Sequence, residues 1–492
     1  MTTYKKTILF LLIGILFPIG IQGKVKLPSI IGDGMVLQRN TVVNIWGWAE
    51  PEKKIKVSNS WSRDVVSVKA DKNGHWTATI STGDAGGPYT ITIDDGEPRI
   101  LEDVLLGEVW LCSGQSNMEM PMQGFESQPV HGSFETLLHA GEFPQIRLFH
   151  VPRATSDVPL EDCNASWEQS STSSAATFSA TGYYFATSLH RSLGIPVGMI
   201  ESDWGATRIE TWMSKDAALN VDREILLTNA HHDASNQVAS LFNAMIMPLT
   251  NYTLKGFLWY QGESNKGYHS KYHLNMAEMV KCWRTIWGGG DDMPFYYVQL
   301  APFDYDIKVH QFNGEKNPIL LPLVVESQIK AMNLIPNSGI AVNTDLGDAL
   351  EIHPPRKDLV GKRLAMLALS KTYGFHHDDA TGPLFKEAEF AGNEVIITFD
   401  SGSTLIPIRD PLYGFEIAGE DKVFHPAEAY VIYENYTSSK KVRVYSDKVL
   451  KPVAVRYAFR NVVEKVNLTN TLGLPAFPFR TDNWDNVYAP SK

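Results

Sequence analysis

The stretch VWLCSGQSN at residues 109–117 passes from an apolar run into a turn of small and polar residues. Short apolar runs recur along the middle of the chain, at residues 197–200, 257–260, 295–298 and 340–342. Such runs are typical of strands in a parallel sheet that is buried on both faces. They alternate with helical patterns, the clearest of which cover residues 181–193, 271–287 and 357–373. Residues 104–375 are therefore predicted to form an α/β domain, with helices on both faces of a parallel sheet.

The two ends of the chain carry a different pattern. Residues 24–103 contain runs of alternating or β-branched residues, such as VVNIWGW at 42–48 and YTITI at 89–93, with turn signals between them. Similar runs occur toward the C-terminus, for example EVIITF at 394–399. We therefore predict β-sandwich-like domains at 24–103 and 376–492, the second packed on the α/β domain.

The N-terminus has the order of a secretory signal peptide. Lys5 and Lys6 precede an uncharged run at residues 7–21, and Gly23 follows as a small residue. A membrane anchor is the alternative, but a spanning helix needs about 20 apolar residues and this run is shorter. We predict a signal peptide at 1–23 and a periplasmic or secreted mature protein, without stable membrane insertion.

Charge and cysteine content narrow the class of protein. The net charge of −11 provides no basic stripe for a nucleic-acid partner. The three cysteines, Cys112, Cys163 and Cys282, are too few for a disulfide framework, and Cys112 lies in an apolar run as a buried thiol would. Their spacing to histidines does not resemble a zinc site. We therefore expect neither a metal nor a cofactor.

Small and polar residues follow the predicted strands. They form the segments GQSN at 114–117, DWGAT at 203–207, QGESN at 261–265, TDLGD at 344–348 and EIHP at 351–354. In open α/β sheets, ligands bind beyond the carboxyl ends of the strands. We therefore expect these segments, although far apart in sequence, to meet at one edge of the sheet.

The residues in these segments match the roles of an acyl-transfer site, which needs a nucleophile, a base and donors for an oxyanion. Ser116 lies on a tight turn between a strand and a helix, which exposes its hydroxyl group. His353 is the candidate base, and the Gly205 N–H and the Gln261 side-chain amide are candidate oxyanion donors. Each of these residues alone has an ordinary structural explanation. Their joint placement at successive strand ends is what favours catalysis.

A resemblance to a known family supports this interpretation. The segment LGEVWLCSGQSNMEM at 106–120 resembles the nucleophile block of the sialate O-acetylesterase family, whose members are SGNH-like carbohydrate O-acetylesterases. Other segments that resemble the family's blocks are GDGMVLQR at 32–39, WYQGESN at 259–265, IHP at 352–354, GFEIAG at 414–419 and PFRTD at 478–482. The resemblance covers nearly the whole mature chain. It implies an SGNH-hydrolase-like fold and metal-independent removal of O-acetyl groups from sugars, with Ser116 and His353 at the family's serine and histidine positions.

The chain departs from the family pattern at two places. The SGNH pattern has an Asp three residues before the His, and here that residue is Leu350. Relatives tend to carry an acid immediately before Ile-His-Pro, so we predict that Glu351 orients the ring of His353. Asp348 is the alternative acid, and a Ser–His dyad with a backbone carbonyl on the ring is a third arrangement. Relatives also often have Gly-Gly-Thr where this chain has GAT at 205–207, so the residue that faces the oxyanion stays open.

The sequence therefore predicts a serine esterase that removes O-acetyl groups from carbohydrates through an acetyl-Ser116 intermediate, similar to sialate 9-O-acetylesterases. An acetylesterase for plant polysaccharide, such as xylan or pectin, is an alternative, because fold and motifs do not fix the sugar. A non-catalytic carbohydrate-binding protein is a second alternative, which the intact Ser116, Gln261 and His353 disfavour. Aromatic residues near the strand ends could stack on a sugar, although such residues more often belong to the core; they are Trp204, Trp212, Trp259 and Tyr260.

Overall fold

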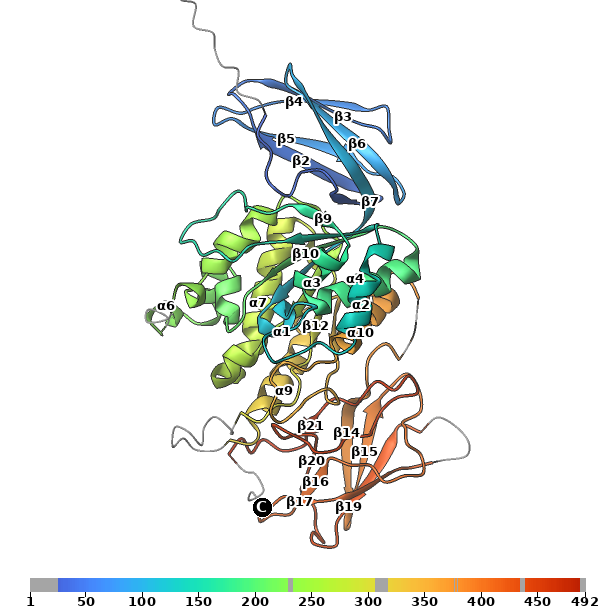
Figure 1. Ribbon diagram of the computed structural model, residues 1–492. Helices are drawn as coiled ribbons and strands as arrows, with labels where there is room; N and C mark the ends of the chain where they lie inside the picture. Colours follow the sequence, from blue (N-terminus) through green and yellow to red (C-terminus); the bar gives the residue numbers. More distant parts are fainter. Residues whose placement is uncertain are drawn as a thin grey trace, which may run out of the picture.

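The computed structural model describes residues 25–228, 233–305, 317–375, 377, 379–433 and 439–486. The chain forms three parts in a row, with β structure at either end and an α/β part between them (Figure 1). The predicted signal peptide at 1–23 lies outside the described residues. Among the residues that are described, no helix has the length and apolar character needed to cross a membrane.

The N-terminal part consists of two β layers. Its strands are β1 (Val36–Gln38), β2 (Val42–Trp48), β3 (Lys54–Asn59), β4 (Val65–Lys69), β5 (His75–Ser81), β6 (Gly86–Asp94) and β7 (Pro98–Gly114). One layer is the antiparallel pair β2–β5, and the other contains β4, β3, β6 and the first half of β7. Along β5 the residues alternate between buried and exposed, as expected for a strand with one face against a core.

Strand β7 connects this part to the α/β part. Its first half pairs antiparallel with β6, and its second half pairs parallel with β10 (Val197–Asp203) and β11 (Gly256–Tyr260). The domain boundary predicted between residues 103 and 104 therefore falls inside a single strand. One hydrophobic core also runs continuously from the N-terminal layers into the α/β part. A strand shared by two sheets has no turn residues at the junction, so the sequence does not mark it.

The central sheet has the order β13-β12-β11-β7-β10-β8-β9. All neighbouring pairs are parallel except β8–β9, which is antiparallel. The strands not yet defined are β8 (Ile146–His150), β9 (Trp167–Gln169), β12 (Phe295–Val298) and β13 (Ser338–Ala341). The α-helices are α1 (Ser116–Glu119), α2 (Ser133–Leu138), α3 (Thr172–Thr177), α4 (Ala180–Leu193), α5 (Lys215–Val221), α6 (Ile225–Thr228), α7 (His269–Trp287), α9 (Leu320–Met332) and α10 (Lys357–Lys371).

Helices cover both faces of this sheet (Figure 1). Trp110 of β7 packs edge-on against Phe185 of α4, and α10 packs against α4 on the same side. On the other face, Trp259 of β11 packs against Trp283 of α7, which contacts α9. The three helices predicted from the sequence match α4, α7 and α10 closely, and the predicted buried stripe of α10 is confirmed, with Val360, Leu364 and Leu367 at 0% exposure.

The C-terminal part is a second β structure with a hydrophobic core of its own. Its two four-stranded sheets have the orders β14-β15-β19-β18 and β17-β16-β20-β21. The strands are β14 (Leu384–Ala391), β15 (Glu394–Asp400), β16 (Phe415–Ala418), β17 (His425–Pro426), β18 (Glu428–Val431), β19 (Lys441–Tyr445), β20 (Ala454–Tyr457) and β21 (Phe479–Arg480). This part packs on the α/β part through Arg480, which forms an ion pair with Glu326 of α9 at 2.9 Å.

Candidate active site

The turn that carries Ser116 follows directly from the end of β7. Gly114 has a φ of +144°, and a Cβ atom there would lie 2.1 Å from the Tyr260 carbonyl oxygen, so only glycine fits. The Gln115 N–H donates to the same carbonyl at 3.0 Å, which ties the turn to the end of β11. Ser116 is the first residue of α1 and is partly exposed. The turn therefore presents the serine hydroxyl at the carboxyl edge of the sheet.

His353 lies next to this hydroxyl, although 237 residues separate the two in sequence. Its Nε2 is 2.8 Å from Ser116 Oγ. Its Nδ1 is 2.6 Å from Oε1 of Gln128, an oxygen that can only accept a hydrogen bond. Nδ1 must therefore carry the proton, which leaves Nε2 of the neutral ring as an acceptor for the serine O–H. This is the tautomer that a general base for Ser116 requires.

Gln128 is a further residue at this site, and no sequence motif indicates it. It lies on a short loop, where backbone hydrogen bonds join Phe125 and Gln128 in both directions at 3.0 and 3.1 Å. The ring of Phe125 packs edge-on against the ring of His353, with centroids 5.1 Å apart. The loop thus fixes the imidazole through both a hydrogen bond and a ring contact. A glutamine in a turn has no distinctive spacing, so the sequence offers no signal for this role.

The contact at Nδ1 differs from the predicted one, because the group placed there is an amide rather than the carboxylate of Glu351 or Asp348. Asp348 Oδ1 accepts the backbone N–H groups of Leu350 at 2.7 Å and of Glu351 at 3.3 Å. It therefore stabilises the loop that leads to His353. The predicted acids lie close to the histidine along the chain, whereas the residue on Nδ1 comes from the segment after Ser116.

Gly205, the predicted oxyanion donor, lies against Ser116, and its N–H already has a partner. A methyl group at Gly205 would be 3.2 Å from Ser116 Cβ, so the two backbones are in close contact. The Gly205 N–H donates to Glu119 Oε2 at 2.6 Å, and the other oxygen of this carboxylate pairs with Arg153. The next residue, Ala206, has a φ of +59°, the left-handed region in which glycine is favoured. The backbone at this position would therefore suit glycine better than alanine.

The side-chain amide of Gln261, the other predicted oxyanion donor, also has partners already. Its side-chain Nε2 donates to the Thr207 carbonyl at 3.1 Å and to Asn265 Oδ1 at 2.7 Å, which uses both amide hydrogens. Its Oε1 accepts from the Tyr272 hydroxyl at 2.8 Å, and the side chain is completely buried. Gln261 therefore connects the loops after β10 and β11. A glutamine at a strand end fits either role in the sequence, and only its contacts separate them.

Of the four aromatic residues considered for sugar stacking, three belong to the core. Trp212, Trp259 and Tyr260 are completely buried, whereas Trp204 is partly exposed beside Gly205. The guanidinium carbon of Arg153 lies 5.4 Å from the centre of the Trp204 ring. Trp204 and Arg153 are thus the aromatic and cationic groups beside the Ser116 turn.

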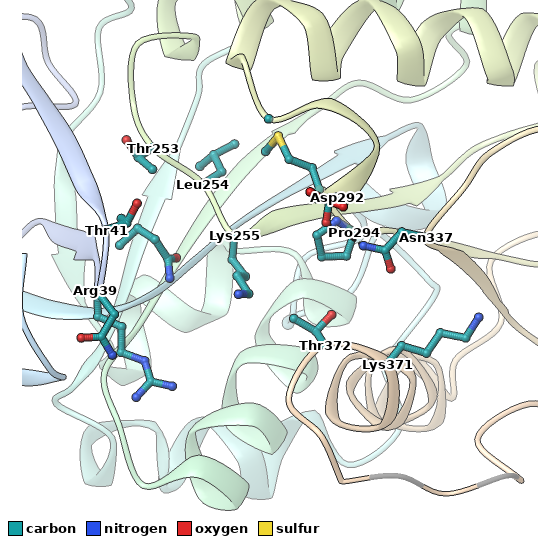
Figure 2. A pocket seen from close by; sticks show the side chains of 14 residues that line it. Arg39, Thr41, Thr253, Leu254, Lys255, Asp292, Pro294, Asn337, Lys371 and Thr372 are labelled. Carbon is teal, nitrogen blue, oxygen red and sulfur yellow. Dashed lines mark hydrogen bonds between the residues drawn. The ribbon is translucent and has the colours of Figure 1, made fainter.

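A pocket of about 460 Å³ lies away from this site (Figure 2). Its lining includes Lys255, Pro294 and Asn337, which immediately precede β11, β12 and β13. These are the amino ends of the strands, opposite the edge that carries Ser116. The pocket is therefore separate from the candidate active site.

Among the described residues there is no cluster of three or more His, Cys, Asp or Glu side chains suited to a metal ion. Cys112 is a free thiol that is completely buried beneath the nucleophile turn, as expected for a core residue. Burial raises the pKa of Cys112 well above its ordinary value, so the thiol stays protonated. Cys112 is therefore a structural thiol, whereas the partly exposed Ser116 hydroxyl is the group that contacts His353.

The parallel sheet, the strand-end serine and its contact with histidine define the chain as an SGNH-like carboxylic ester hydrolase. Residues 106–369, more than half of the chain, match the family model for carbohydrate esterase, sialic acid-specific acetylesterase. The chain belongs to this family, whose activity is the removal of O-acetyl groups from carbohydrates.

Individual relatives agree with this assignment. Sialate O-acetylesterase from Homo sapiens is 28% identical over 404 residues, with 76% of each chain covered. The Mus musculus protein of the same name is 29% identical over 447 residues, which cover 76% of this chain and 79% of its own. The crystal structure of a carbohydrate acetylesterase from Xanthomonas citri is 36% identical and has a TM-score of 0.83. It covers 94% of this chain and 100% of its own, so the similarity includes both β parts.

Proposed function

We propose that this chain is a serine O-acetylesterase that acts through an acetyl-Ser116 intermediate. The observation that carries the proposal is the 2.8 Å contact between Ser116 Oγ and His353 Nε2, on a ring whose tautomer Gln128 fixes. Oγ attacks the acetyl carbonyl carbon while its proton passes to Nε2. The imidazolium then protonates the sugar oxygen, the ester C–O bond breaks, and an acetyl-enzyme remains. Water attacks this ester with His353 as base, and acetate leaves with regeneration of the serine hydroxyl.

The oxyanion that forms in both steps needs hydrogen-bond donors. The backbone N–H groups of Ser116 and Gly205 are the proposed donors, because both lie at the nucleophile. The Gly205 N–H is available only when Glu119 withdraws, since this carboxylate accepts it at 2.6 Å. Arg153 already binds the other carboxylate oxygen and can hold Glu119 in a withdrawn position. Substrate binding and exposure of the second donor are therefore coupled in this mechanism.

For the substrate, the name of the mammalian relatives, sialate O-acetylesterase, supports an O-acetylated sialic acid, and the 9-O-acetyl group is the target that we propose. The local charge pattern favours a second candidate, a neutral O-acetylated polysaccharide such as acetylxylan. A sialic acid carries a carboxylate that would compete with Glu119 for Arg153, whereas a neutral sugar can stack on Trp204 without disturbing this ion pair. Pectin is an acidic polymer, so its carboxylates would also compete with Glu119 for Arg153. Hydrolysis of matched O-acetylated sialic acid, xylan and pectin would rank the three.

Export is proposed on the basis of the sequence pattern at residues 1–23. N-terminal sequencing of protein isolated from the periplasm or medium would test it, with cleavage near Gly23 as the expected result.

The esterase proposal is tested by hydrolysis of 4-nitrophenyl acetate and of O-acetylated sugars by the wild-type protein and by Ser116→Ala and His353→Ala. Both variants are expected to lose activity on all substrates. Ser173→Ala serves as a matched control, because Ser173 is an exposed serine of α3. Equal rates for the wild type and Ser116→Ala would overturn the assignment of the nucleophile.

A further inference from the structure

Three polar side chains form a buried network directly beneath the Ser116–His353 pair. Asn117 follows the nucleophile and is 1% exposed, Lys357 is the first residue of α10 and is completely buried, and Glu263 follows β11 at 6% exposure. Lys357 Nζ donates to Asn117 Oδ1 at 2.5 Å, and Asn117 Nδ2 donates to Glu263 Oε1 at 2.6 Å. The amide thus bridges an ammonium group and a carboxylate. The esterase mechanism described above uses none of these three groups.

The same amide also connects the nucleophile segment to the histidine segment. Asn117 Nδ2 donates a second hydrogen bond, at 3.1 Å, to the carbonyl of Ile352, the residue immediately before His353. Ser116 and Asn117 are neighbours, as are Ile352 and His353. One side chain therefore joins the two backbones that carry the reacting pair, across 235 residues of sequence.

The partners of the amide determine which way round it lies. An ammonium group can only donate, so it selects the oxygen of Asn117, whereas a carboxylate and a carbonyl can only accept, so they select the nitrogen. Without Lys357, a protonated Glu263 could donate to Oδ1. The amide would then turn over, and the Ile352 carbonyl would lose its donor. Lys357 thus fixes the orientation that the link to the His353 segment requires.

The location of Lys357 is costly for the fold, which argues that the residue has a role. Burial of an ammonium group is unfavourable, and the N-terminus of a helix disfavours positive charge. Burial lowers the pKa of Lys357 to about 7, although the nearby Glu263 opposes the shift. Burial also raises the pKa of Glu263, against the contacts with Asn117 and Lys357. Glu263 Oε2 has no hydrogen-bond partner in the part of the chain that the structure describes.

We propose that Lys357, through Asn117 and with Glu263 as its counter-charge, is a positioning residue that sets the alignment of Ser116 and His353. The proposal rests on the esterase function proposed above. Lys357 does not touch the substrate in this role, and it acts only on the orientation of Asn117. Loss of Lys357 should therefore impair the chemical step and leave substrate binding nearly unchanged.

The test compares kcat and KM for wild type, Lys357→Met, Asn117→Asp and the double variant Lys357→Met/Glu263→Gln. Misplacement of a reacting pair by about 1 Å costs up to about 100-fold in rate, so Lys357→Met is expected to lower kcat by about 10- to 100-fold with KM almost unchanged. Phosphorylation of Ser116 by diethyl 4-nitrophenyl phosphate should slow in parallel. In the double variant, the amide introduced by Glu263→Gln can donate to Asn117 Oδ1 as readily as it accepts from Nδ2, so the Asn117 orientation stays unselected and kcat should stay as low as in Lys357→Met.

Lys362→Met is the matched control, because Lys362 lies on the same helix with a side chain 58% exposed, and its kcat should equal that of wild type. If Lys357→Met fails to fold, Asn117→Asp decides the question, since it removes the donor to Ile352 but keeps the size of the side chain. A folded Lys357→Met or Asn117→Asp protein with wild-type kcat would overturn the positioning role. Ser116→Ala is measured in parallel. If it stays active, the proposed acetyl-Ser116 mechanism itself fails; if it is inactive beside a fully active Lys357→Met, only the network fails.

Discussion

Replacement of Gln128 tests whether its hydrogen bond prepares His353 to act as the general base. In Gln128→Ala the hydrogen bond from His353 Nδ1–H, at 2.6 Å in the structure, is lost. A hydrogen bond to a group that becomes charged contributes about 1.5–3 kcal/mol, and about 1.4 kcal/mol corresponds to a tenfold change in rate. We therefore expect kcat to fall by about 10- to 150-fold. Initial rates with 4-nitrophenyl acetate, and stopped-flow measurement of the acylation step, provide the assay.

Gln128→Glu tests the same contact by strengthening it instead of removing it. A carboxylate at this position stabilises the imidazolium, so the pKa of His353 rises. The low-pH limb of the kcat/KM profile, which reports the base in the free enzyme, should then move to higher pH. Gln123→Ala, at an exposed glutamine of the same segment, should behave as wild type. Wild-type kcat in a folded Gln128→Ala protein, or an unmoved limb in Gln128→Glu, would refute the assignment of Gln128.

Three further predictions concern the acids near the histidine, the backbone beside the nucleophile and a buried carboxylate. Glu351→Gln and Asp348→Asn should each keep kcat within about twofold of wild type, because surface substitutions usually change free energies by no more than about 0.5 kcal/mol; a loss comparable to that of Gln128→Ala would restore the acid predicted from sequence. Ala206→Gly should raise the free energy of unfolding by about 0.5–1 kcal/mol, because the left-handed conformation is costly for alanine and open to glycine; an unchanged midpoint in thermal unfolding would contradict this. Glu201→Gln should flatten the pH dependence of stability. Burial raises the pKa of Glu201 from its ordinary value of 4.5 to about 8, so between these two pH values the folded chain binds more protons than the unfolded chain, and stability falls as pH rises. Glutamine keeps an acceptor for the Ser179 N–H. The thermal unfolding midpoint of Glu201→Gln relative to wild type should therefore rise from about pH 5 to about pH 8. A difference in midpoint that stays constant over this range would exclude a role for the Glu201 proton.

The fold was largely predictable because the strands of the central sheet are short apolar runs. Val109, Trp110, Leu111 and Cys112 are all completely buried, as expected for a strand covered on both faces. Helices α4, α7 and α10 were recognised from their periodicity. The boundary at residue 103 could not be found in this way, because β7 belongs to two sheets and stays extended and apolar across the junction.

Within the site, the reacting pair was predictable and its surroundings were not. Ser116 and His353 occupy strand ends, and topology alone brings such residues to one edge of the sheet. The roles of Gln128 and Gln261 depend on which atoms of an amide meet which partners, at distances of 2.6 to 3.1 Å. A sequence pattern contains no information at that scale. The buried position of Lys357 was equally hidden, since a lysine at the start of a helix usually remains in solvent.

The most direct test of the esterase mechanism is to trap the acyl-enzyme. Wild-type protein is mixed with excess 4-nitrophenyl acetate, quenched in acid within milliseconds, digested and analysed by mass spectrometry. An acetyl group on the peptide that contains Ser116, formed at the rate of the pre-steady-state burst and missing in Ser116→Ala, is the predicted result. An acetyl group that forms at this rate on another residue, or turnover by Ser116→Ala at the wild-type rate, would contradict it.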